Sequence, residues 1–91
     1  MKKKEQINIT ILLFGYLQES VGKKRLKVIG RDTIFDTLVE IKKQHPSLHA
    51  KMGVAAYVML LNGVNLLGKD LSQVTLKDGD IIAFVPFVAG G

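Results

Sequence analysis

Short runs of alternating apolar residues, interrupted by a single helical run, constrain the fold of this 91-residue chain more than any other feature. Alternation with period two places successive side chains on opposite faces of a strand. Strands are predicted at Ile7–Phe14, Arg25–Ile29, Tyr57–Leu61 and Ile81–Phe87. Asn62-Gly63 is typical of a tight turn, and it predicts a further short strand at 64–67. Gly15 ends the first strand, so the first two strands are predicted to form a hairpin with a long connection.

The helical run lies between the second and third strands. Thr33-Ile-Phe-Asp36 fits the capping-box pattern that begins helices. Apolar residues then recur at helical spacing, at Ile34, Leu38 and Ile41. These features predict a helix from about Thr33 to Gln44, stopped by Pro46. The order of elements predicts an α+β domain, with a mixed sheet of four to five strands and one main helix.

One helix covers only one face of such a sheet, yet both faces carry apolar residues toward the end of the chain. In the last strand we assign three residues to the helix-covered face: Ile81, Ala83 and Val85. Phe84 then falls on the opposite face. Two explanations stay open for the second face. Either the loops Lys51–Ala56 and Leu71–Leu76 cover it, or it is a protein-binding patch.

The formal charge of +5 comes from basic clusters, at Lys2–Lys4 and at Lys23, Lys24, Arg25, Lys27 and Arg31. A nucleic-acid surface is one interpretation. However, the few aromatic residues do not interleave with these lysines, as a platform for stacking bases would require. A solvated face or an acidic protein partner is therefore favoured, and no nucleic-acid partner is predicted.

Composition narrows the class of protein. Apolar residues form 47% and charged residues 23% of the chain, which is ordinary for one compact domain. Cysteine is absent, which excludes disulfides and thiolate chemistry. The apolar run Ile7–Phe14 is too short to cross a membrane, and no small-residue cleavage site follows it. We expect a cytoplasmic protein without a membrane partner.

Catalytic groups are sparse. His45 and His49 flank Pro46 at the predicted helix end, where a histidine complements the helix dipole. The carboxylates are scattered, and Asp78 and Asp80 fall in a predicted turn that favours aspartate. No nucleophile–base pair, phosphate loop or metal-ligand spacing is found in the sequence. The chain is predicted to have no independent active site and no metal site.

The sequence ends in Gly90-Gly91, directly after the last predicted strand. Glycine has no Cβ, so these two residues can enter a channel too narrow for other residues. A frayed end or a cloning scar is the alternative explanation. We expect a folded domain over residues 1–87 and a flexible tail over residues 88–91.

Three stretches carry a resemblance to a known family: Phe14–Gly22, Leu76–Phe84 and Pro86–Gly91. They are similar, in order, to the Phe-Ala-x-Leu/Val-x-Glu-x-x-Gly, Leu-x-Asp-Gly-Asp-x-Val-Ala-Phe and Pro-Pro-Val-x-Gly-Gly motifs of the MoaD/ThiS sulfur-carrier family. The chain looks closest to the MoaD branch, the small subunits of molybdopterin synthase. It departs from the family in its Pro86-Phe87 pair, where the usual sequence is Pro-Pro, and in its basic charge.

The resemblance implies a ubiquitin-like β-grasp fold and a chemical role for the terminus. It implies that a MoeB/ThiF-like activating enzyme adenylates Gly91, next to Gly90, with ATP and magnesium. A thiocarboxylate then forms on Gly91, and its sulfur passes to a precursor pterin in a MoaE-like large subunit. The chain itself binds no cofactor in this scheme. The candidate partner-binding residues are Phe14, Phe84, Pro86, Phe87 and Val88.

Other functions remain open at this point. The same terminus suits a ubiquitin-like protein modifier, or a sulfur carrier for tRNA or thiamin thiolation. A further alternative is a non-catalytic β-grasp interaction module with an inert tail.

Overall fold

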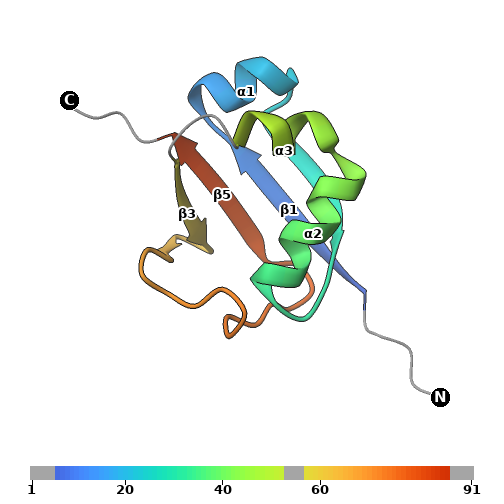
Figure 1. The fold of residues 1–91 in the computed structure, drawn as a ribbon, viewed down its shortest axis with the longest axis vertical. Coiled ribbons are helices and arrows are strands. Elements are labelled where there is room, and N and C mark those ends of the chain that lie inside the picture. Colours follow the sequence, from blue (N-terminus) through green and yellow to red (C-terminus); the bar gives the residue numbers. More distant parts are fainter. Residues whose placement is uncertain (1–5, 53–56, 87–91) are drawn as a thin grey trace.

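The computed structural model describes residues 6–52 and 57–86 of the chain (Figure 1). The strands are β1 (Ile7–Leu13), β2 (Arg25–Gly30), β3 (Tyr57–Leu61), β4 (Val64–Asn65) and β5 (Ile81–Pro86). The helices are α1 (Gly15–Val21), α2 (Ile34–Gln44) and α3 (Pro46–Met52). The predicted α+β class and the predicted strands are confirmed, with β4 shorter than expected. The predicted boundary between a folded domain (1–87) and a flexible tail (88–91) lies outside the described residues.

The five strands form one mixed sheet in the order β2-β1-β5-β3-β4. The first and last strands lie side by side at its centre and run parallel, with Ile11 opposite Ile82 and Leu13 opposite Phe84. β2 pairs antiparallel with β1, which confirms the predicted hairpin, and β3 pairs antiparallel with β5. The sheet therefore joins the two ends of the described chain.

Helix α2 lies across one face of the sheet (Figure 1). It begins at the predicted N-cap, where the Thr33 hydroxyl accepts a hydrogen bond from the Asp36 amide at 3.2 Å. The buried Thr37 hydroxyl accepts a hydrogen bond from the Arg31 amide at 2.9 Å. A Cβ on Gly30 would lie 3.2 Å from this hydroxyl and 2.7 Å from Ile9, so glycine is needed where α2 approaches β2.

The sequence analysis missed two short helices, each of seven residues. Helix α1 lies in the predicted long connection between the first two strands. It begins at Gly15 without a side-chain N-cap bond, so it lacks the usual sequence signal of a helix start. Helix α3 begins at Pro46, which was interpreted only as a stop for α2, although proline is well suited to the first position of a helix. Each helix contributes a fully buried leucine, Leu17 from α1 and Leu48 from α3, to the core. Within the described residues no helix is long and apolar enough to cross a membrane.

The assignment of faces in β5 is wrong. Phe84 is wholly buried on the helix-covered side, where its ring meets the Tyr57 ring edge-on at a centroid distance of 5.4 Å. Ile81 is 40% exposed on the opposite side. Because Ile82, Ala83 and Phe84 are all buried, alternation within β5 cannot show which side faces the helices. The register with β1 decides it, since Phe84 lies opposite the buried Leu13.

A pair of lysine substitutions tests this assignment. Phe84→Lys places a charge in the core and is expected to cost several kcal/mol, roughly 3–5 kcal/mol from the lost ring alone. Ile81→Lys in the same strand is expected to cost about 1 kcal/mol or less, because Ile81 is partly exposed. Urea unfolding of both variants measures the difference, and equal losses of stability would contradict the assignment.

The outer edge of β2 is partly covered by a side chain of α2. The Gln44 amide donates to the Ile29 carbonyl and accepts from the Ile29 amide, both at 3.1 Å. This pair of bonds reproduces what a neighbouring strand would make, and it blocks one position of an otherwise open sheet edge. Gln44 therefore ties the end of α2 to the sheet.

Replacement of Gln44 by Glu tests this bridge. The ionised carboxylate cannot donate to the Ile29 carbonyl, so we expect a loss of about 1 kcal/mol in unfolding free energy at neutral pH. Acidification below a pKa of ~4.3 restores a donor and should narrow the difference from wild type. Gln73→Glu, at an exposed loop position, is the control. If both variants unfold at the same denaturant concentration at neutral pH, Gln44 does not hold the edge.

Candidate functional site

The end of β5 is the base of the C-terminal segment that the sequence analysis singled out. β5 ends at Pro86, which pairs with Tyr57 of β3. On its other side Pro86 meets α1, because a Cβ built on Gly15 would lie only 3.1 Å from Cγ of Pro86. Pro86 is thus held between β3 and α1. The predicted site residues Phe87, Val88, Gly90 and Gly91 lie outside the described residues.

Gly15 is a site-forming residue that the sequence reasoning interpreted only as a strand break. Its φ of +57° lies in the left-handed region, and its missing side chain leaves the room that the Pro86 ring occupies. The family motif has Ala after its Phe, whereas this chain has Gly15, and that difference was the signal available in the sequence. Gly15 and Pro86 together set where the chain leaves β5.

The sheet face opposite the helices, which we call the open face, is apolar at its centre. Its central side chains come from β1, β3 and β5: Leu12, Val58, Leu60, Ile81, Ala83 and Val85. The loop 71–76 does not cover them, because its backbone bonds to the start of α2, from the Phe35 amide to Leu71 and from the Ile34 amide to Val74. Lys51 belongs to α3, and residues 53–56 lie outside the described residues. Residues after β4 approach only the edge of the open face, where Leu67 and Lys69 line a pocket with Val58.

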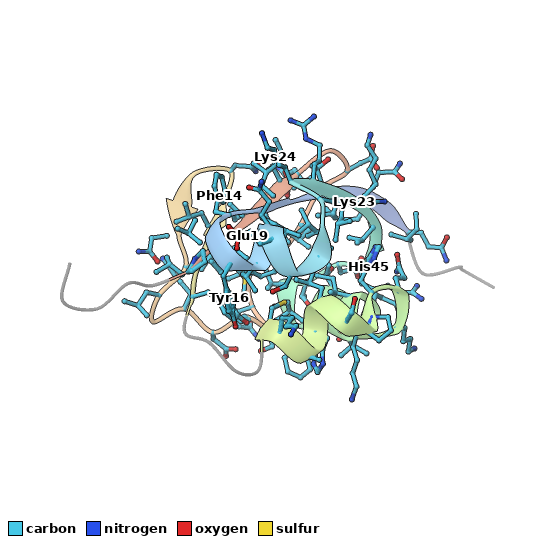
Figure 2. All side chains as sticks on the ribbon, turned by 90° about the horizontal axis from the view of Figure 1, so that it is seen from above. Phe14, Tyr16, Glu19, Lys23, Lys24 and His45 are labelled. Atoms are coloured by element: carbon cyan, nitrogen blue, oxygen red, sulfur yellow. The ribbon has the colours of Figure 1, made fainter. Side chains whose placement is uncertain are left out.

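Phe14, another predicted partner-binding residue, is 44% exposed where β1 meets α1. It helps to line a cavity of about 340 Å³. The lining residues are Leu12, Leu13, Phe14, Gln18, Lys24 and Arg25. Figure 2 shows the labelled Phe14 and Lys24 on the side of α1 away from the helix α3. The structure therefore brings Phe14 and Pro86 to the same end of the sheet, whereas Phe84 belongs to the core.

The charges of the open face are distributed unevenly. Arg25 and Lys27 are exposed on β2 and pair with Leu12 and Thr10 of β1. The carboxylate of Glu40 does not lie on the open face, because Glu40 belongs to α2, which covers the opposite face. It lies 3.3 Å from the Arg31 guanidinium and 3.8 Å from the Lys43 ammonium group.

Of the two carboxylates in the turn before β5, Asp80 makes the predicted local backbone bond, whereas the partner of Asp78 is a distant residue of β1. Asp78 accepts a hydrogen bond from the Asn8 amide at 2.7 Å, and Asp80 accepts one from the Lys77 amide at 2.8 Å. The Asp78 bond ties the turn to the start of β1.

Burial raises the pKa of the Tyr57 phenol, and this side chain is neutral beside Phe84 at physiological pH. The described residues contain no group of three or more His, Asp or Glu residues that could hold a metal ion.

Comparison with known proteins agrees with this architecture. The model of the ThiS family matches residues 11–91. No curated protein matches the chain. Among solved structures, small archaeal modifier protein 1 from Methanosarcina acetivorans is 24% identical, with a TM-score of 0.74 over 96% of this chain and 99% of that chain.

Two other similar structures are protein complexes. A complex of subunits 1 and 2 of molybdopterin-converting factor from Helicobacter pylori matches with 24% identity and a TM-score of 0.64, over 93% of this chain and 100% of that chain. The BexX/CysO complex of Amycolatopsis orientalis matches with 20% identity and a TM-score of 0.69, over 91% and 99%. These likenesses confirm the predicted β-grasp fold. The family match covers most of the chain, and the protein therefore belongs to the ThiS family of ubiquitin-like sulfur carriers.

Proposed function

We propose that this protein carries sulfur on the C-terminal carboxyl group of Gly91 for molybdopterin synthesis. The Gly90-Gly91 ending of a ThiS-family chain is the observation that carries the proposal. Gly91 lies five residues after Pro86, the end of β5, which is held between Gly15 and Tyr57. The likeness to a molybdopterin-converting factor complex supports the choice of pathway.

The chemistry of a chain terminus explains why an activating enzyme is needed. A terminal carboxyl group has a pKa of about 3.5 and is ionised at pH 7, and a carboxylate is a poor electrophile. A MoeB/ThiF-like enzyme would use ATP and magnesium to form an acyl adenylate on Gly91 with release of pyrophosphate. A sulfide-level donor would then displace AMP, so that the C–O bond to AMP breaks and a C–S bond forms.

The folded domain would contribute the docking energy. Ordering the last four residues in a partner costs about 1–2 kcal/mol per residue in backbone entropy. The apolar open face, together with Phe14 and Pro86, is the surface that can offset this cost in a MoaE-like large subunit. Phe84 contributes indirectly, because it supports β5 from the core.

A ubiquitin-like protein modifier is the second candidate. The similar small archaeal modifier protein favours it, and the same adenylate would then react with an amine to form an amide. A sulfur carrier for thiamin or tRNA thiolation would use the same Gly91 thiocarboxylate. In each case we propose a cytoplasmic site of action, where an activating enzyme has access to ATP.

One residue added after Gly91 tests the role of the terminus. The extended chain is expected to fold normally but to gain no sulfur, because its reactive carboxyl group no longer follows the two glycines. Intact mass after incubation with the activating enzyme, ATP and a sulfur donor gives the answer. Normal sulfur loading of the extended chain would contradict the carrier function.

Gly90→Val tests the need for a narrow chain end. A β-branched side chain beside the reacting carbonyl should block activation, transfer or both. The melting temperature should stay within about 1 °C of wild type, because the substituted residue lies beyond the end of β5. Gly90→Ala is the graded control and should retain more transfer. Unfolding of the valine variant would instead assign Gly90 a structural role.

A further inference from the structure

The strand register arranges the open face in rows that begin with a cation. One row runs from Arg25 through Leu12 and Ala83 to Leu60. At a strand spacing of about 4.8 Å, the Arg25 backbone lies about 10 Å from Ala83 and about 14 Å from Leu60. The neighbouring row places Lys27 beside Thr10. The basic residues thus form one straight margin of the apolar centre.

This margin continues to the base of the C-terminal segment. Lys24 and Arg25 line the cavity of about 340 Å³ beside Phe14. Phe14 is followed directly by Gly15, which meets Pro86. Lys24, Arg25 and Lys27 are named below as the basic margin, and all of them are exposed.

No carboxylate balances the basic margin on the described strands. The strand residues that share the open face on the far side, in β3 and β4, are Val58, Leu60 and Asn65. No described ion pair involves a residue of the basic margin, and Glu40 of α2 pairs instead with Arg31 and Lys43. On the described strands of the open face, the charged side chains are therefore the cations of β2. Beyond the strands, Lys69 lines a pocket with Val58 at the far side, and Asp78 bonds the Asn8 side chain at the start of β1.

We propose that the open face binds a protein surface with an apolar centre and a row of carboxylates, and that the basic margin pairs with those carboxylates. This inference rests on the proposed function and assigns the surface to the sulfur-accepting large subunit. A partner with a central apolar patch can bury Leu12, Ile81 and Val85, whereas a nucleic acid would leave them without a matching surface. Charge complementarity at the margin would also fix the orientation in which β5 and its C-terminal segment approach the partner.

The test reverses the charge of the margin. Arg25→Glu combined with Lys27→Glu should slow association with the recombinant MoaE-like subunit of the same organism by about tenfold or more at low ionic strength. The difference should shrink at high ionic strength, because salt screens exposed charges. Lys42→Glu, an exposed position on α2, is the control and should bind like wild type. Melting temperatures of all variants check the fold.

The outcomes separate this inference from the proposed function. If wild type and the reversed variant bind the subunit equally well, the basic margin has no role, and the carrier function stands. If wild type neither binds that subunit nor gains sulfur at Gly91 by intact mass, the proposed function fails as well. If wild type gains sulfur but does not bind the subunit, only the assigned partner is wrong.

Rescue of the reversed variant by a carboxylate-to-lysine change on the subunit would support direct pairing. If reversal abolishes binding of a single-stranded RNA probe but leaves subunit binding unchanged, the inference is overturned in favour of a nucleic-acid surface.

Discussion

The parallel pairing of β1 with β5 is the interaction on which the rest of the structure depends. It joins strands from opposite ends of the sequence and aligns Ile11 with Ile82 and Leu13 with Phe84 under the helices. Such non-local pairing requires closure of a long loop before its contacts are gained, so it depends on the whole intervening chain. The same pairing decides which side of β5 is buried and therefore which residues remain on the open face.

Two close approaches, at opposite ends of the sheet, each require a glycine. Gly30 lets α2 settle on β2 near Thr37, and Gly15 makes room for the Pro86 ring at the end of β5. Neither glycine contributes a side chain, yet each leaves room for neighbouring side chains that a Cβ would crowd. The C-terminal segment thus starts from a strand end supported on both sides, by β3 and by α1.

The open face meets two opposing demands. The proposed docking role requires an apolar surface, whereas an open sheet edge must not pair with other sheets. The cations along β2 and the Gln44 bridge to Ile29 both act against association at that edge. In the proposed complex, the positive charge would limit non-specific contact at this edge and select an acidic partner surface.

The sequence by itself determined the strands, helix α2 with its Thr33 cap, the α+β class and the Gly90-Gly91 ending, because periodicity, capping and turn chemistry are local. Family motifs also identified the β-grasp fold. Only the tertiary structure decided the rest. It turned Phe84 into the core, assigned α1 and α3, and placed Gly15 against Pro86. These features depend on which strands pair and in which register, and a central strand that is apolar on both faces carries no local signal of its orientation.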